Sequence, residues 1–203
     1  MMKHGLFGGT FDPPHVGHLM MAEVARESLN LDVVDFIPTN IPPHKLGQDV
    51  QPASLRVKML KSALVKFPFF RVSTIELDRQ GISYTIDTVR DIFRESPEDE
   101  LFLLVGADML KDLPHWKEVG ELLSLVTVVA APRPGIRIKE TAERLHKQYG
   151  HARIIALSMP ELDISSTWLR ERMRNGLRVD PLLPAGVAEV ISQVGGYVGG
   201  SIS

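Results

Sequence analysis

The sequence of 203 residues contains no cysteine. That absence excludes disulfide bonds, cysteine-ligated zinc and thiol catalysis, and it is compatible with a cytoplasmic location. A long hydrophobic run is missing as well, because the longest apolar stretch, residues 122–131, is interrupted by Ser124 and Thr127. Such a stretch is too short to cross a bilayer, and the N-terminus does not read as a signal peptide. We therefore expect a cytoplasmic protein without a membrane partner.

An excess of charge of one sign is also lacking. The 23 Lys and Arg residues nearly balance 25 Asp and Glu residues, for a formal net charge of -2. This balance argues against a nucleic acid as a general partner. The hydrophobic share of 44% and the charged share of 24% are typical of a globular chain that buries a core. The length predicts one domain over residues 1–203, with a small C-terminal helical part from about residue 165.

Short apolar runs alternate with amphipathic stretches along the chain. The runs expected as strands are residues 5–7, 33–38, 70–73, 101–105, 125–131 and 153–157. The stretches expected as helices are residues 16–30, 53–67, 85–95, 116–123, 139–149, 166–175 and 185–193. This alternation predicts an α/β fold with a doubly wound parallel sheet covered by helices on both faces. Ligands of such sheets bind beyond the carboxyl ends of the strands.

The most informative segment joins the first predicted strand to the first predicted helix, where residues 8–18 read GGTFDPPHVGH. Gly8 and Gly9 allow the backbone to turn sharply and to approach a ligand closely. The start of the following helix offers N–H groups and the positive end of its dipole, which together favour phosphate. His15 and His18 share one face of the first helical turn. Both can donate hydrogen bonds to phosphate oxygens, and histidine changes its charge near neutral pH.

Zinc coordination is the alternative role for this histidine pair. A zinc site usually needs a third protein ligand, yet the sequence has no cysteine and no HExxH pattern. The start of a helix also repels a cation while it attracts phosphate. The sequence therefore favours phosphate binding by His15 and His18. Neither a Walker loop nor a GxGxxG fingerprint is present.

A second polar segment begins at Ile164, where the sequence reads ISSTWLR. Its hydroxyl side chains are good N-cap residues for the helix that follows. Arg170 lies about one turn further on, on the same face as Ser166 and Thr167. Hydroxyls, a helix N-terminus and a guanidinium together suit a polyphosphate, although an ordinary capped surface helix has the same pattern.

The predicted loop of residues 39–52 is long and contains PPHK at residues 42–45. Structureless loops of this length are often lids or binding loops. A plain connector between two elements has the same composition, so both interpretations stay open from the sequence.

The segment GGTFDPPHVGH resembles the HxGH signature of the nucleotidyltransferase superfamily, and ISSTWLR resembles its ISSTxxR motif. Further segments of the same kind follow in order: PPHK (42–45), GISYTIDT (81–88), GAD (106–108), LPHW (113–116), RPG (133–135), LLP (182–184) and GY (196–197). Together they resemble the bacterial nicotinate mononucleotide adenylyltransferases from Gly5 to about Tyr197, apart from residues 136–151. The resemblance implies a Rossmann-like nucleotidyltransferase fold.

The resemblance also implies a reaction. ATP and nicotinate mononucleotide would be the small-molecule substrates, and deamido-NAD and pyrophosphate the products, in a step of NAD biosynthesis. The 5′-phosphate of the mononucleotide attacks the α-phosphorus of ATP in line. Since this phosphate is already anionic, the protein must align two polyanions and neutralise their charge. Mg²⁺ is the implied cofactor, held by phosphate oxygens and water rather than by a named protein ligand.

Catalytic roles are implied for five residues. Thr10 would position the reacting phosphates, and His15 and His18 would donate hydrogen bonds to ATP, with His18 on the α-phosphate. Arg170, with residues 165–167, would hold the β- and γ-phosphates, and Lys45 would add positive charge.

ATP binding is implied for a larger set, in which Gly106 and Asp108 contact the ribose and Arg133 borders the adenine. The whole set is Gly8, Gly9, Thr10, Phe11, His15, His18, Gly106, Asp108, Arg133, Ile164, Ser165, Ser166 and Arg170.

The mononucleotide would be bound by Lys45, Tyr84, Thr85 and Trp116. An indole face stacks well on a pyridinium ring, so Trp116 is expected against the nicotinate. Thr85 is expected to bind its carboxylate near the start of a helix. Both residues are predicted to open helices, and Tyr84 to shape the pocket. Trp116 as a buried core anchor is the alternative.

Three other functions stay open from the sequence. A sister adenylyltransferase for phosphopantetheine or nicotinamide mononucleotide would share residues 8–18, but Ser83, Tyr84, Thr85 and Trp116 favour a pyridine nucleotide. A non-catalytic sensor of NAD precursors would have no use for groups that stabilise a leaving pyrophosphate. A zinc hydrolase would retain its metal through purification.

Overall fold

The computed structural model describes residues 1–41 and 50–197 of the chain. Within these ranges six strands form one parallel sheet in the order β3-β2-β1-β4-β5-β6. The strands are β1 (Lys3–Gly9), β2 (Val33–Pro38), β3 (Phe70–Val72), β4 (Glu100–Gly106), β5 (Val126–Ala131) and β6 (Arg153–Ala156). The strand order reverses between the central strands β1 and β4, so the doubly wound parallel sheet predicted from the sequence is confirmed.

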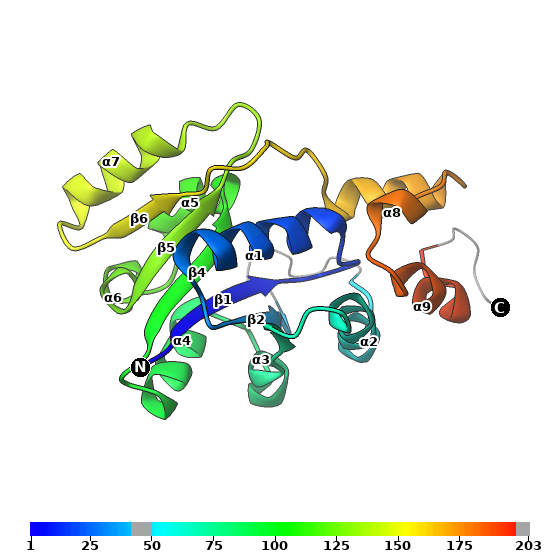
Figure 1. Cartoon of the computed structure of the whole chain (residues 1–203), viewed down its shortest axis with the longest axis horizontal. Coiled ribbons are helices and arrows are strands. Elements are labelled where there is room, and N and C mark those ends of the chain that lie inside the picture. The colour runs from blue at the N-terminus through cyan, green and yellow to red at the C-terminus, as the bar shows by residue number, and fades with distance from the viewer. Residues whose placement is uncertain (42–49, 198–203) are drawn as a thin grey trace.

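Helices connect the strands of this sheet and follow its last strand (Figure 1). In the described ranges the α-helices are α1 (Val16–Leu29), α2 (Ala53–Leu64), α3 (Ile75–Arg79), α4 (Thr85–Glu95), α5 (Ala107–Asp112), α6 (Val119–Leu125), α7 (Ile138–Gln148), α8 (Ser166–Arg174) and α9 (Val187–Val194). Two short 3-10 turns are η2 (Leu113–His115) and η3 (Asp180–Leu182). None of these helices is long and apolar enough to cross a membrane.

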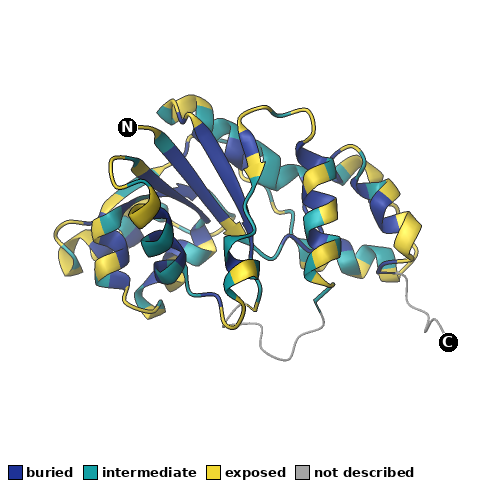
Figure 2. Ribbon diagram, turned by 90° about the horizontal axis from the view of Figure 1, so that it is seen from below, coloured by how far each residue is buried: buried dark blue, intermediate teal, exposed yellow. Residues whose placement is uncertain are grey.

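Two buried apolar clusters cover the two faces of the sheet. The first joins helices α1, α2, α8 and α9 to strand residues such as Phe36 and Leu104. The second joins α4, α5, α6 and α7 to strand residues such as Leu103 and Val105. Neighbouring residues of a strand point to opposite faces, which explains why Leu103 and Leu104 belong to different clusters. Figure 2 shows the strands as the buried layer, with the exposed positions mainly on helices and loops.

The predicted strands are all present, with ends that differ by no more than two residues. One predicted helix, however, begins at the wrong residue, because α6 starts at Val119 and not at Trp116. Trp116 has extended backbone directly after the η2 turn. Glu118 then adopts a left-handed φ of 49°, which a right-handed helix cannot contain. Trp116 therefore lies in a turn and opens no helix.

The C-terminal helices lie beside α2 near the carboxyl end of β1 (Figure 1). Helix α9 contacts α2, and the first apolar cluster continues between them through Met59, Leu60, Val187 and Ile191. This packing brings Tyr197, which follows α9, close to the loop that follows β1.

Candidate functional site

A cavity of about 580 Å³ opens at the carboxyl ends of β1 and β4. Its walls include most of the residues predicted for the site: Gly8, Gly9, Thr10, Phe11, His15, His18, Tyr84, Thr85, Asp108, Trp116, Arg133, Ser165 and Ser166. A smaller hollow of about 180 Å³ shares His15 and His18 with it and adds Gly106 and Ile164. The structure thus brings the two polar motifs together at the edge of the sheet where doubly wound folds bind ligands.

Arg170 is the one predicted site residue of the described ranges that lines neither hollow. Lys45 lies outside the described residues. Arg170 lies beside the cavity, where its Nη1 donates to the backbone oxygen of Asp12 at 2.8 Å and its Nη2 donates to Oγ1 of Thr167 at 3.3 Å. Since Thr167 does line the cavity, Arg170 reaches the site through its neighbours in this structure.

His15 and His18 stack on each other at the start of α1. Their ring centroids are 3.6 Å apart, with 24° between the ring planes. The backbone N–H of His15 donates to Nδ1 of His18 at 3.1 Å. Since Nδ1 of His18 is the acceptor, the proton of the neutral ring is assigned to Nε2. Sequence spacing predicted the shared face of the pair, and the structure confirms it.

His15 is held in its neutral form. Its side chain is almost fully buried, and burial together with the positive charge of Arg133 lowers its pKa from 6.5 to about 3. The expectation that this histidine changes its charge near neutral pH is therefore wrong for the structure. A neutral imidazole still carries one N–H donor. Among the described residues, Nδ1 of His15 has no hydrogen-bond partner.

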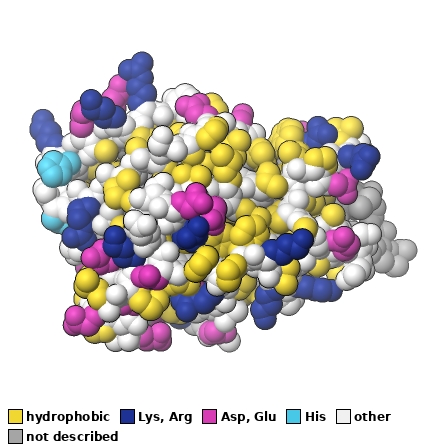
Figure 3. All heavy atoms as spheres, viewed as in Figure 1, with side chains coloured by type: hydrophobic (Ala, Val, Ile, Leu, Met, Phe, Trp, Pro, Cys, Tyr) yellow, Lys and Arg dark blue, Asp and Glu magenta, His cyan; other side chains and the backbone are white. Residues whose placement is uncertain are grey.

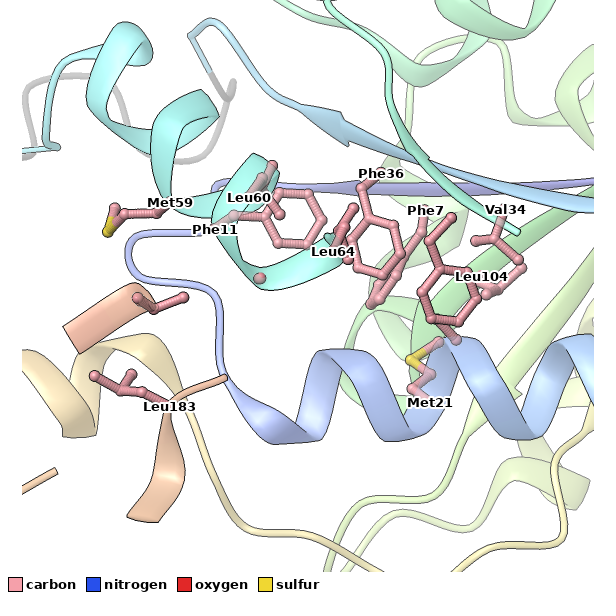
Figure 4. Packing of buried hydrophobic residues seen from close by; sticks show 14 of the residues in the cluster. Phe7, Phe11, Met21, Val34, Phe36, Met59, Leu60, Leu64, Leu104 and Leu183 are labelled. Atoms are coloured by element: carbon pink, nitrogen blue, oxygen red, sulfur yellow. The ribbon is translucent and has the colours of Figure 1, made fainter. Parts of the chain in front are cut away.

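The ring of Phe11 packs against the His18 ring of this pair. Phe11 is 1% exposed and has a left-handed φ of 50°, a conformation that is uncommon for a bulky residue. Its ring meets the ring of His18 at a centroid distance of 5.0 Å and the ring of Phe7 at 5.6 Å. Figure 4 shows Phe11, Phe7 and Phe36 side by side in the first apolar cluster. The apolar core therefore fixes the position of the His18 ring.

The second motif is tied directly to the first. Oγ of Ser165 accepts a hydrogen bond from the backbone N–H of Trp168 at 3.2 Å, as predicted for an N-cap. Oγ of Ser166 donates to the backbone oxygen of Pro13 at 2.9 Å. The start of α8 and the loop before α1 are thus one polar surface, although about 150 residues of sequence separate them.

Arg133 and Asp108 line both hollows together with the two histidines. Nη1 of Arg133 donates to the backbone oxygens of Leu162 and Ile164, at 2.7 and 3.1 Å, and so holds the segment that precedes α8. The carboxylate of Asp108 turns back over Gly106, where any Cβ would collide with it. Gly106, the last residue of β4, must therefore stay glycine for Asp108 to keep this place.

Tyr84, Thr85 and Trp116 also line the cavity, and Trp116 lines the smaller hollow as well. Thr85 is the first residue of α4, so the prediction that it opens a helix is confirmed. Trp116 is partly buried against the second apolar cluster and still lines the cavity, so packing in the core leaves part of it at the cavity wall. Nζ of Lys117, which also lines the cavity, lies 4.6 Å from the centre of the Tyr84 ring.

Glu76 and Thr88 also line the cavity, and sequence reasoning named neither as a site residue. Ser83, which the sequence cited in favour of a pyridine nucleotide, lines the cavity as well. Oγ1 of Thr88 donates to Oε1 of Glu76 at 2.8 Å, and Nη2 of Arg79 donates to Oγ1 of Thr88 at 3.0 Å. Burial raises the pKa of the Glu76 carboxyl, although Thr88, Ser83 and Arg79 act in the opposite direction. Glu76 lies on α3, whose five residues are too few to leave a periodic pattern.

No group of three or more His, Cys, Asp or Glu side chains in the described ranges is placed to hold a metal ion. On the face seen in Figure 3, basic side chains are interspersed with acidic ones and do not gather into one patch. The cavity walls therefore combine hydrogen-bond donors and a few charges, without a metal cage.

The fold and this site define a nucleotidyltransferase of the cytidylyltransferase-like family, whose model matches residues 6–172. A structure of Plasmodium falciparum nicotinic acid mononucleotide adenylyltransferase complexed with APC has the same fold, with a TM-score of 0.80 at 15% identity over 97% of this chain and 98% of that one. A putative nicotinate-nucleotide adenylyltransferase from Vibrio parahaemolyticus has a TM-score of 0.70 at 18% identity over 98% of both chains.

Closer relatives identify the branch of this family. The nicotinate-nucleotide adenylyltransferase of Bacillus subtilis is 40% identical over 97% of this chain and 99% of its own length. Probable nicotinate-nucleotide adenylyltransferases of Geobacillus kaustophilus and Dehalococcoides mccartyi are 41% and 43% identical over 97% and 95% of this chain, and over 87% and 95% of their own lengths. The chain therefore belongs to the nicotinate-nucleotide adenylyltransferase family.

Proposed function

We propose that this enzyme transfers the adenylyl group of ATP to nicotinate mononucleotide, producing deamido-NAD and pyrophosphate. The observation that carries the proposal is the single cavity in which the histidine pair and the ISST segment meet Tyr84, Thr85 and Trp116. The histidines and hydroxyls of that cavity are suited to phosphates, and the Trp116 ring and the Thr85 hydroxyl are suited to a nicotinate. The relatives that share 40% or more of the sequence carry the same activity in their names.

The reaction is a direct displacement at phosphorus. An oxygen of the mononucleotide 5′-phosphate forms a bond to the α-phosphorus of ATP, the bond between this phosphorus and the β-bridging oxygen breaks, and pyrophosphate leaves. The nucleophile is already an anion, so the protein supplies alignment and charge stabilisation rather than a strong base. His18, with its proton assigned to Nε2, donates to the α-phosphate oxygens where negative charge develops.

The triphosphate is held by neighbouring groups. Neutral His15 donates one N–H, Thr10 positions the reacting phosphates, and the hydroxyls of Ser165 and Ser166 receive the β- and γ-phosphates at the start of α8. Arg170 donates a hydrogen bond to Oγ1 of Thr167 and so acts on the triphosphate through that residue, and Lys45 adds positive charge from its loop. Asp108 binds the ribose, with Gly106 leaving room for its carboxylate.

Mg²⁺ enters this proposal with ATP. The described part of the chain offers no three-ligand group for a metal, and Mg²⁺ on nucleotides commonly keeps phosphate oxygens and water as ligands. When bound, the ion neutralises charge on the triphosphate and on the leaving pyrophosphate. We expect the reaction in the cytoplasm, with which the absence of cysteine is compatible.

The first test is pyrophosphate release from Mg-ATP, with nicotinate mononucleotide and nicotinamide mononucleotide in parallel. Strong release with the acid and little with the amide supports the proposal. Release only with phosphopantetheine would instead assign the chain the activity of a phosphopantetheine adenylyltransferase. Tight ATP binding without pyrophosphate release from any of these substrates would instead indicate a sensor.

The nicotinate end has its own test in Trp116→Ala. Loss of the stacking ring is expected to raise the KM for nicotinate mononucleotide by about tenfold or more, with the KM for ATP nearly unchanged. Steady-state kinetics with each substrate varied in turn measures both constants. An effect confined to ATP would remove Trp116 from the mononucleotide site.

A further inference from the structure

Four polar side chains from distant parts of the chain meet behind the loop that follows β1. We call them the Asp12 cluster: Asp12, Arg56, Arg170 and Tyr197. Asp12, Arg56 and Tyr197 are 1%, 2% and 7% exposed, so the cluster is a charged group within the interior. A buried charge is retained only when hydrogen bonds and partners compensate its lost hydration, and the contacts of this cluster supply them.

Asp12 is the centre of the cluster. The Tyr197 hydroxyl donates to its Oδ1. The backbone N–H of Gln51 donates to its Oδ2 at 3.2 Å, and Nη1 of Arg170 lies 4.0 Å from the same oxygen. Arg170 also donates to the backbone oxygen of Asp12. Both carboxylate oxygens and the main chain of this residue are therefore held from outside the loop.

Arg56 holds the preceding part of the same loop. Its Nη1 donates to the backbone oxygens of Thr10 and Thr39, each at 2.9 Å, and its Nε donates to the backbone oxygen of Gln51 at 3.0 Å. One guanidinium on α2 thus joins the main chain after β1 to the main chain after β2.

Tyr197, which follows α9, binds Asp12 through its hydroxyl, and 185 residues separate the two in the sequence. Burial and then the charge of Asp12 raise the pKa of Tyr197, so its hydroxyl keeps its proton and donates. The loop that it holds carries Thr10 and leads directly to His15, and neither Tyr197 nor Arg56 lines the cavity. Their contribution to the site is positional.

We propose that Tyr197 and Arg56, acting on Asp12 and on the backbone oxygen of Thr10, are positioning residues that set the geometry of the catalytic loop and of the histidine pair. The C-terminal turn after α9 is thereby part of the catalytic machinery. The expected change in kcat rests on the proposed function. The expected change in the position of the histidine rings rests on the hydrogen bonds alone.

Tyr197→Phe tests the inference because it removes one hydroxyl and keeps the ring. The expected result is a fall in kcat of about tenfold, within the ~10²-fold that a misplacement of about 1 Å can cost, with both KM values changed by less than about twofold. Tyr149→Phe is the matched control, since the Tyr149 hydroxyl accepts a hydrogen bond from Nε2 of Gln148 at 3.1 Å and its ring packs against the second apolar cluster, on the other face of the sheet. The control is expected to keep the wild-type kcat.

A second readout works without turnover. Nuclear magnetic resonance of the histidine rings is expected to show shifted signals of His15 and His18 in Tyr197→Phe, and wild-type signals in Tyr149→Phe. Unchanged histidine signals, or an unchanged kcat accompanied only by a lower melting temperature, would overturn the inference. If the wild-type enzyme turned over none of the mononucleotides, the proposed function would fail, and the histidine signals would still decide on the positioning role.

Discussion

At the residue scale, the protonation state of His15 depends on burial as much as on residue identity. His15 has a pKa of about 3 in the folded chain, against 6.5 for an exposed ring. Between about pH 3 and pH 6.5, the unfolded chain therefore binds a proton at this histidine and the folded chain does not. Folding stability from this group is complete above about pH 6.5 and is lost as the pH falls toward 3.

The stability of the wild type is thus expected to be about 2 kcal/mol lower at pH 5 than at pH 8 through His15 alone. Urea denaturation at both pH values, with His15→Gln as the comparison, measures this contribution. Glutamine does not titrate, so the variant is expected to lose that part of the pH dependence. An equal pH dependence in both proteins would contradict the buried neutral state.

His18 differs from its partner because its Nδ1 is already occupied by the backbone of His15. His18→Ala is expected to lower kcat by more than about 10²-fold with only a modest loss of ATP affinity, as for a group that stabilises charge in the transition state. Turnover kinetics and ATP titration measure the two effects. His146→Ala, on the exposed side of α7, is the control that should keep activity; wild-type turnover in His18→Ala would exclude this residue from the mechanism.

At the element scale, the junction between β1 and α1 depends on packing of the loop against its own strand. A Cβ at Gly9 would lie 3.0 Å from the ring of Phe11, whereas a Cβ at Gly8 would meet nothing within 4 Å. Gly9→Ala is expected to destabilise the fold by about 1–3 kcal/mol, because Phe11 must shift in a close-packed core. Gly8→Ala should change stability by less than about 1 kcal/mol. Urea unfolding of the two variants compares them directly, and equal effects would show that Phe11 is free to move.

Short helices and turns are the elements that the periodic patterns of the sequence do not predict. Helix α4 was predicted to the residue because its apolar face repeats over three turns, whereas α3 and α5, with five and six residues, carry no such repeat. The start of α6 was misplaced because the left-handed Glu118 leaves no mark in the sequence. Glu76 was missed for a related reason, since it lies on α3, one of these short helices.

At the scale of the whole molecule, a buried network crosses three strands of the sheet on the side of α4. Oδ2 of Asp35 on β2 is 2.8 Å from Nε2 of His4 on β1, and Nε of Arg71 on β3 donates to Oδ1 of Asp35 at 2.8 Å. Burial alone would raise the pKa of Asp35, but its bonds to His4 and Arg71 together lower it below 3.8. The network therefore stabilises the fold above about pH 4, and that contribution is lost as the pH falls through the lower folded-state pKa.

Asp35→Ala is expected to cost about 2 kcal/mol of unfolding free energy at pH 7, less than the ~3–5 kcal/mol of fully buried pairs because Arg71 is half exposed. The difference from the wild type should shrink below pH 4. Chemical denaturation across pH 3 to 8 measures it, with Asp180→Ala, from an exposed pair with Arg178, as a control that changes little. A difference that stayed constant down to pH 3 would contradict the lowered pKa.

Local chemistry was readable from the sequence alone. The alternation of buried strands and amphipathic helices determined the doubly wound sheet, and the segments at residues 8–18 and 164–170 predicted a phosphate-type site and carried the family resemblance. These features depend on neighbours within a few residues, where strand and helix periods and the geometry of a helix start act directly.

Only the tertiary structure decided how distant groups combine. It made His15 neutral through burial and Arg133, turned Arg170 toward Asp12, and brought Tyr197 to the loop after β1. Each of these outcomes depends on desolvation and on contacts between side chains that are far apart in the chain, which no local pattern encodes. The sequence therefore determined which chemistry is present, and the packing of the sheet, α2 and α9 decided the geometry and the protonation state in which it is held.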